Sequence, residues 1–105
     1  MNNRNKKTNP DHELYRAILE LQDVQECYQF FVDLCTVSEM KAMEQRYEVA
    51  RLLSKGMIYN EILEQTGASS ATISRVNRSL NYGTDTYRKL FARLYQEEDG
   101  EEEQA

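Results

Sequence analysis

The chain has 105 residues, a net charge of −5 at pH 7, one proline and four glycines. It contains no apolar run long enough to span a membrane and no apolar signal region at its start, so we expect neither a membrane protein nor an exported one, but a cytoplasmic one. Because so few residues break helices, the composition favours a single all-α domain.

The two ends of the chain differ from its middle in charge. Residues 1–10 contain three basic residues and no acidic one, whereas residues 96–105 contain six carboxylates and no basic residue. Such segments bury too little apolar surface to fold. We therefore expect a disordered basic arm over 1–10, a helical domain over 11–95 and a disordered acidic tail over 96–105. A domain of this size is marginally stable alone, which favours oligomerisation.

The first helix is predicted to begin at Asn9-Pro10, with asparagine as the cap and proline in the first turn. Asp23 and Glu26 then form a capping box that opens a second helix from Val24 to Leu34. Apolar residues surround most of the second helix, so we expect a second copy of the chain to cover it.

The two cysteines, Cys27 and Cys35, are eight positions apart on the second helix, which is too far for a disulfide within that helix. The only histidine is His12, so one chain cannot assemble a zinc ligand set. We expect buried thiols, no metal and no cofactor.

A second capping box, Thr36 and Glu39, predicts a long third helix over about Val37 to Ser54, ended by Gly56. Its apolar face comprises Met40, Met43, Tyr47, Ala50 and Leu53. The arginines and glutamates between them are spaced for ion pairs on a solvated face. No second catalytic group accompanies these acids, so the pattern does not indicate acid–base catalysis.

Residues 58–80 are typical of two short helices joined by a tight turn. The first covers about Asn60 to Thr66, and Gly67 suits the left-handed conformation of the turn. Ser69 or Ser70 then caps the second helix. Leu63 is expected at the closest approach of the two helices, which would make them pack slightly wider than usual.

The second helix of this pair has two distinct faces. Ile73, Val76 and Leu80 form an apolar stripe, while Ala71, Ser74, Arg75 and Arg78 face away from it. No carboxylate occurs between Gly67 and Thr84. A small, polar and cationic face fits the major groove of DNA, so we interpret the pair as a helix-turn-helix. An αα-hairpin that only packs is the alternative.

A last helix is predicted after Asn81-Tyr82-Gly83, with Thr84 as its cap. The side chains expected to be buried are Tyr87, Leu90, Phe91 and Leu94, and those expected to be exposed are Arg88, Lys89 and Arg93.

Two stretches, Cys-Tyr-Gln-Phe-Phe-Val-Asp-Leu-Cys-Thr (27–36) and the eighteen residues from Thr66 to Gly83, resemble the tryptophan repressor superfamily, in particular its YerC/YecD branch of Trp-repressor-related proteins. The resemblance extends from about Leu14 to Leu94. It implies a six-helix fold with a helix-turn-helix, an intertwined homodimer, and two recognition helices that enter successive major grooves.

The resemblance also implies a ligand site. Thr36, Arg46, Arg75 and Ser79 match positions that contact the corepressor in the family, and two arginines would suit a small anionic effector. Val76 stands where tryptophan-binding members have glycine, which disfavours tryptophan itself. The alternative is that Arg46 and Arg75 are simply solvent-exposed, with Arg75 serving DNA.

The leading hypothesis is a homodimeric, sequence-specific transcriptional regulator, a repressor, bound to a pseudo-palindromic operator in double-stranded DNA. Its expected DNA-contacting residues are Ser69, Ser70, Ala71, Thr72, Ser74, Arg75, Arg78, Arg88 and Lys89. Glu61 and Glu64 replace the basic residues that DNA-binding relatives carry before the turn. They motivate the rival hypothesis of a helical dimer that binds another protein. No nucleophile–base pair or phosphate-binding loop indicates an enzyme.

Overall fold

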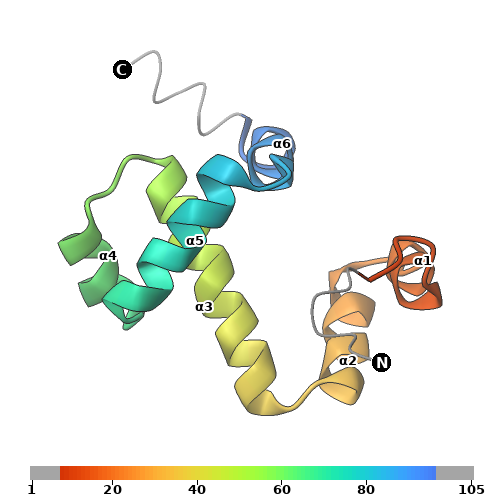
Figure 1. Cartoon of the computed structure of the whole chain (residues 1–105). Helices are drawn as coiled ribbons and strands as arrows, with labels where there is room; N and C mark the ends of the chain where they lie inside the picture. The colour runs from red at the N-terminus through yellow and green to blue at the C-terminus, as the bar shows by residue number, and fades with distance from the viewer. Residues whose placement is uncertain (1–7, 97–105) are drawn as a thin grey trace, which may run out of the picture. The chain divides into compact units, whose positions relative to one another are not determined.

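The computed structural model describes residues 8–96, and this part of the chain contains six helices and no strand (Figure 1). The helices are α1 (Glu13–Leu19), α2 (Val24–Leu34), α3 (Val37–Ser54), α4 (Tyr59–Thr66), α5 (Ser70–Tyr82) and α6 (Thr86–Leu94). The all-α prediction is confirmed. The expected arm and tail fall largely on residues 1–7 and 97–105, outside the described residues. No described helix is both long and apolar enough to cross a membrane.

The chain divides into two compact units at residues 40 and 41, which are described separately as the N-terminal and C-terminal units. In the N-terminal unit, the Thr36–Glu39 capping box forms completely. Asp23 and Glu26 form only the cap half of theirs, because the Glu26 carboxylate accepts from the Gln22 amide at 3.1 Å and not from the Asp23 amide. Asp23 Oδ1 accepts a hydrogen bond from the Glu26 amide at 2.8 Å, and Thr36 Oγ1 accepts one from the Glu39 amide at 3.1 Å. The Glu39 carboxylate in turn accepts from the Thr36 amide at 2.8 Å, so α2 and α3 start where the sequence predicts.

The predicted start of α1 is wrong. Asn9 Oδ1 accepts a hydrogen bond from the Asp11 amide at 2.8 Å, and the Asn9 carbonyl accepts one from the His12 amide at 3.0 Å. These bonds close a separate turn, so Asn9 does not cap the helix. His12 caps it instead, with its Nδ1 accepting from the Leu14 amide at 3.1 Å.

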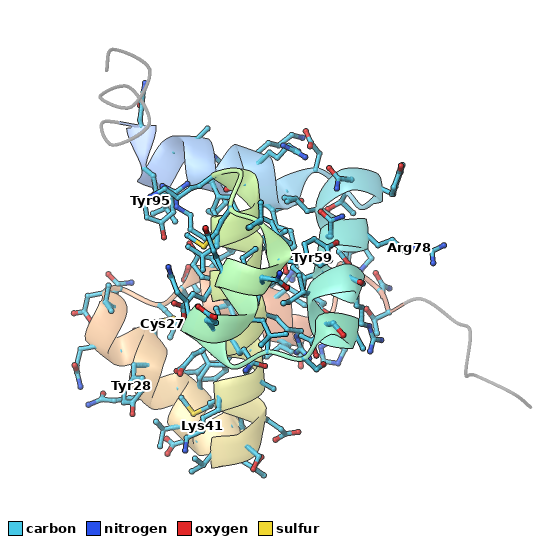
Figure 2. The ribbon with its side chains drawn as sticks, turned by 90° about the vertical axis from the view of Figure 1, so that its left-hand side faces the viewer. Cys27, Tyr28, Lys41, Tyr59, Arg78 and Tyr95 are labelled. Carbon is cyan, nitrogen blue, oxygen red and sulfur yellow. The ribbon has the colours of Figure 1, made fainter. Side chains whose placement is uncertain are left out.

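None of the described residues of the N-terminal unit is buried. Leu19 and Val24 are 84% and 86% exposed, and Tyr28 projects from α2 in Figure 2. The two free cysteines, Cys27 and Cys35, are only partly buried, which corrects the expectation of fully buried thiols. The described residues of the N-terminal unit therefore do not cover the apolar circumference of α2.

The core lies in the C-terminal unit. The buried side chains come from four helices and the turn between α4 and α5: Val49, Ala50, Ile62, Ala68, Ile73, Val76, Leu80 and Phe91. The predicted stripe of α5 is thereby confirmed. The pairing of α4 with α5 differs from the prediction, because Ile62 is completely buried and Leu63 is 43% exposed. The helices need not pack wider to accommodate Leu63.

Hydrogen bonds from Gly67 and from the Thr66 side chain stabilise the turn between α4 and α5. Gly67 adopts φ 72°, and its amide donates to the Leu63 carbonyl at 2.9 Å. Thr66 Oγ1 donates to the Ile62 carbonyl at 2.7 Å and accepts from the Ala68 amide at 3.1 Å. A left-handed residue at this position favours glycine, as predicted.

Helix α6 starts later than predicted. Thr84 is hydrogen-bonded through Oγ1 to Oγ1 of Thr86 at 2.8 Å, and Asp85 takes the cap position in a left-handed conformation with φ 71°. Phe91 is buried, but Leu90 and Leu94 are 37% and 59% exposed, so the prediction that they are buried is wrong.

Helix α6 is anchored to α3 at its far end. The hydroxyl groups of Tyr47 and Tyr95 are 2.8 Å apart, and the Arg51 guanidinium lies 3.8 Å from the centre of the Tyr95 ring. Arg51 was expected on a solvated face. Cation–π attraction and the stacked carbon surface of the rings place it against the aromatic cluster instead.

Candidate nucleic-acid interface and adjoining cavities

The outward face of α5 has the composition that the sequence predicts. Ala71, Ser74, Arg75 and Arg78 are all exposed, on the side of the helix opposite its buried stripe. Arg78 points away from the helix into solvent (Figure 2). This face offers small side chains near its N-terminus and guanidinium groups further along, which is the order that close approach to a DNA groove requires.

The hydroxyl groups at the start of α5 differ in whether they are already hydrogen-bonded within the protein. Ser69 Oγ accepts from the Thr72 amide at 3.1 Å and donates to Thr72 Oγ1 at 3.0 Å. Ser69 is therefore the cap, and it and Thr72 satisfy each other. Ser70, the alternative cap, is exposed at the first position of the helix. The free backbone N–H groups of this turn and Ser70 face solvent, where an anion can bind.

The basic residues of α6 are exposed, but Arg88 is not free to move. Its Nη2 donates to Asn81 Oδ1 at 2.8 Å, and its Nε lies 3.7 Å from Asp85 Oδ1. Asn81 also donates to the Asn77 carbonyl at 3.0 Å. These contacts connect α6 to the C-terminal end of α5 and fix the position of the Arg88 guanidinium. Lys89, the other predicted contact on α6, is exposed.

Three of the four predicted ligand residues line one cavity. An open cavity of about 350 Å³, which we call the arginine cavity, is lined by Arg46, Arg75, Val76, Ser79 and Tyr87. In the described part of the chain neither of its arginines forms an ion pair with a carboxylate. Two guanidinium groups facing one space attract an anion.

Two features modify the predicted ligand site. Val76 is only 3% exposed and lies in the hydrophobic core while also lining the cavity. Its side chain therefore covers the part of the cavity wall that α5 forms. Thr36, the fourth predicted residue, belongs to the N-terminal unit, where its hydroxyl and amide are used to cap α3. The arginine cavity is thus assembled without Thr36.

A second cavity, which the sequence did not indicate, adjoins the first. It has a volume of about 460 Å³ and lies between α3, the end of α5 and the start of α6, so we call it the α6 cavity. Tyr47, Leu90 and the turn at 83–86 line it, and Ser79 and Tyr87 line both cavities. Asp85, which also lines it, has a left-handed backbone conformation that no sequence pattern predicted.

Tyr47 is the titratable group that this environment changes most. Burial, and then the hydrogen bond with Tyr95, raises the pKa of Tyr47 to about 12. The group therefore stays neutral at physiological pH and acts as a donor or acceptor, not as a charge. Among the described residues no group of three or more histidine, cysteine, aspartate or glutamate side chains could hold a metal ion.

Known proteins resemble the chain over most of its length. The family model described as Trp repressor protein matches residues 11–95. The uncharacterized protein YerC of Bacillus subtilis (strain 168) is 51% identical over 86 residues, which are 82% of this chain and 83% of YerC.

Two solved structures also match. A TrpR-like protein from Eubacterium eligens ATCC 27750 superposes with a TM-score of 0.79 at 53% identity, over 84% of this chain and 91% of its own. A Staphylococcus aureus protein, described as a candidate Trp repressor, has a TM-score of 0.79 at 45% identity, over 90% and 94% of the two chains.

Proposed function

Because the chain belongs to the Trp repressor protein family, a family of DNA-binding regulators, and is related to YerC, we propose that it is a sequence-specific transcriptional regulator that binds double-stranded DNA as a homodimer. The observation that carries the proposal is the outward face of α5. It exposes Ser74, Arg75 and Arg78 on a helix whose opposite side is anchored in the core. Such a helix can enter the major groove without unfolding its own support.

Each predicted DNA contact has a role in this proposal. Ala71, Ser74 and Arg75 meet base edges, and Arg75 is suited to guanine. Ser70 and the free amides of the first turn hold phosphate, while Ser69 and Thr72 mainly keep that turn in shape. Arg78, Arg88 and Lys89 position the DNA backbone. Arg88 enters the contact already oriented by Asn81.

The proposed homodimer follows from the N-terminal unit. None of its described residues is fully buried, although α2 carries apolar side chains around most of its circumference. A stable fold must cover such a surface, and a second copy would do so. Two-fold symmetry then places the two α5 helices on half-sites about one helical turn of DNA apart, in a pseudo-palindromic operator. We propose that binding to this operator represses transcription.

A small anion is proposed as effector, held in the arginine cavity by Arg46 and Arg75 with Ser79 beside them. Arg75 lines this cavity and also stands on the outward face of α5. An anion bound to Arg75 would therefore change the charge and orientation of a DNA-contacting group. The Val76 side chain makes tryptophan a poor candidate, because it fills the wall that an indole would need.

The rival function, a protein-interaction module, is favoured by a specific surface on α4. Ile58, Tyr59 and Leu63 are 61%, 39% and 43% exposed, and Glu61 and Glu64 are exposed among them. A surface both apolar and acidic repels DNA phosphate and is suited to a basic partner.

The two functions are separated by selecting duplexes from random DNA with the purified protein, at low and physiological salt, with and without tryptophan. We expect a two-fold-symmetric motif in both the presence and the absence of tryptophan. The double variant Arg75→Ala/Arg78→Ala should lose the motif, and Arg93→Ala, an exposed arginine in the last turn of α6, should retain it. Retention of the motif by the double variant would exclude the groove model, and no motif at any salt would favour the rival.

A further inference from the structure

We propose that the acidic tail of the chain docks on a cationic surface shared by α5 and α6, and that it competes there with DNA phosphate. The contact is autoinhibitory, because the tail occupies arginines that are proposed to contact DNA. Its regulatory role rests on the proposed function. The contact itself does not, and it can be measured without DNA.

The cationic surface is continuous across two helices. Arg88 of α6 donates to Asn81 of α5 at 2.8 Å, and Asn81 lies three positions after Arg78. Residues three apart are neighbours on the surface of a helix, so the exposed guanidinium groups of Arg78 and Arg88 lie on one surface. Arg75, three positions before Arg78, extends it along α5. We call Arg75, Arg78 and Arg88 together the cationic surface.

Little negative charge lies within this surface. No carboxylate occurs between Gly67 and Thr84. Arg88 has Asp85 at 3.7 Å, whereas in the described part of the chain Arg75 and Arg78 form no ion pair with a carboxylate. Exposed cations without neighbouring carboxylates create a positive local potential, which attracts a polyanion.

The acidic tail has the complementary charge. Residues 97–103 contain six carboxylates and no basic residue, and Gly100 is the only other residue among them. Two other parts of the chain would repel this segment. Glu61 and Glu64 are exposed on α4, and residues 11–37 contain six acidic residues and one basic residue. The tail therefore gains more by lying on the cationic surface than on either of these.

The tail is also long enough to reach this surface. Arg88 lies seven residues before Tyr95, which is roughly 10 Å along the axis of α6. Arg78 is roughly 5 Å further, one turn of α5 from the residue that Arg88 contacts. Residues 97–105, at about 3.3 Å each when extended, span up to roughly 30 Å. If the tail turns back along α6, residues 101–103 can therefore lie beside Arg88 and Arg78.

The connection through α6 compensates for the weakness of the individual contacts. An exposed ion pair contributes little by itself, and salt weakens it. Because the tail and the surface belong to one chain, however, the effective concentration of the tail at the surface is on the order of millimolar. DNA must displace the tail to reach the same guanidinium groups. The affinity for specific and for random duplexes should then be lowered by the same factor.

Docking of the tail is tested without DNA, by nuclear magnetic resonance of the full chain labelled with nitrogen-15. Glu101→Gln/Glu102→Gln/Glu103→Gln removes three charges from the tail and is called the tail variant. At low salt it should shift the side-chain Nε–H resonances of Arg78 and Arg88. At about 1 M salt, where the screening length is roughly 3 Å, these resonances should coincide with those of the parent protein.

A control variant separates a local contact from a change in net charge. Asp11→Asn/Glu13→Gln/Glu20→Gln removes the same number of charges at exposed positions in and around α1, and should leave both arginine resonances in place. Equal shifts in the two variants would overturn the proposal, as would unshifted resonances in the tail variant. Shifts confined to Arg51, which stacks on Tyr95 next to the tail, would also overturn it, because the tail would then contact α3.

Competition with DNA is measured by fluorescence anisotropy of a labelled duplex of random sequence. At low salt the tail variant should bind this duplex about threefold to tenfold more tightly than the parent protein, and at about 0.3 M salt the two should bind nearly equally. The control variant, of the same net charge, should gain by a clearly smaller factor. Equal gains in the two variants, or no gain in the tail variant, would overturn the autoinhibitory role.

The two measurements distinguish failure of this proposal from failure of the proposed function. If neither the parent protein nor the tail variant binds DNA, the proposed function is contradicted, and the regulatory role with it. The resonances of Arg78 and Arg88 would still establish or exclude docking of the tail. Shifted resonances together with an unchanged DNA affinity would show a tail that docks without competing, which contradicts autoinhibition alone.

Discussion

Tyr47 takes part in two arrangements at once, since it lines the α6 cavity and its hydroxyl is paired with that of Tyr95. Its neighbours explain why the phenol is held neutral. Phe91 packs edge-to-face against its ring at a centroid distance of 5.5 Å, which removes water that would stabilise a phenolate. A single tyrosine thereby connects the middle of α3 to the end of α6.

We predict that the stability of the protein falls as the pH rises through this titration. The pKa of Tyr47 is about 12 in the folded protein and about 10 in the unfolded chain, so the folded state holds this proton more tightly. The stabilising contribution is therefore complete below pH ~10 and is lost as the pH approaches ~12. A titration of the folded protein followed by phenolate absorbance should show one transition near pH ~12. The variant Tyr47→Phe should lack this transition, and the control Tyr82→Phe, at an 85% exposed site, should retain it.

Gly83 is constrained by the close approach of a neighbouring backbone group, whereas Gly67 is constrained by its left-handed conformation. A Cβ added to it would collide with the backbone carbonyl oxygen of Ser79, which accepts the Gly83 amide at 3.0 Å. We predict that Gly83→Ala lowers the free energy of unfolding by about 2 kcal/mol or more, because backbone must move. Gly67→Ala, left-handed but with open space around it, should cost only about 1 kcal/mol. Urea denaturation would contradict the argument if the two costs were reversed.

At the scale of the helix, the start of α5 depends on one hydroxyl. Replacing Ser69 by alanine removes the acceptor for the Thr72 amide and should cost about 1 kcal/mol of stability. Ser69→Asp should restore the cap, since a carboxylate accepts the same bond, but it places a negative charge where phosphate is proposed to bind. Ser69→Ala should therefore lower both the stability measured by denaturation and the DNA affinity measured by titration. Ser69→Asp should keep the stability and lower the DNA affinity. Equal DNA affinity of the aspartate variant and the parent would exclude phosphate binding at this turn.

Helix boundaries were predictable from sequence where the cap side chain accepts from the backbone amide three residues later. Asp23 with Glu26 and Thr36 with Glu39 specify the starts of α2 and α3, because each side chain bonds a backbone amide a fixed number of residues away. Asn9 is also of a residue type that favours the cap position, but its bonds close a turn instead. The cap of α6 carries no comparable signal, since Asp85 takes that position through a left-handed backbone with no side-chain cap bond.

The candidate site was predictable only in part, for a similar reason. Periodicity separates the outward face of α5 from its buried stripe, because both are properties of one helix. The α6 cavity and the packing of Arg51 on Tyr95 depend on how α3, α5 and α6 meet. Residue spacing within single helices contains no information on that meeting. The α4–α5 contact is a further example, because Ile62 and not Leu63 is the residue of α4 that is buried there. The orientation of α4 about its own axis likewise depends on how it packs against its neighbours.

At the scale of the whole molecule, the proposed dimer makes a direct prediction. Val24 and Val32 on α2 are 86% and 46% exposed, so a carboxylate at either position costs an isolated chain little. In a dimer that covers α2, Val24→Asp/Val32→Asp should bury two unpaired charges and shift the equilibrium to monomer by several kcal/mol. Sedimentation equilibrium measures the shift, with Leu63→Asp on α4 as the control. A parent protein that sediments as a monomer at micromolar concentration would contradict the dimer itself.

Every buried residue of the described chain lies between Val49 and Phe91, and none lies in the N-terminal unit. This uneven distribution has a kinetic consequence. The segment from the second half of α3 to α6 has its own core and is expected to fold in a unimolecular step. If the chain forms the proposed homodimer, completion of α1 and α2 waits for an encounter between two chains, so its rate should rise with protein concentration while the first step stays constant. During synthesis at low copy number, the DNA-facing helices would form before the chain has found its partner.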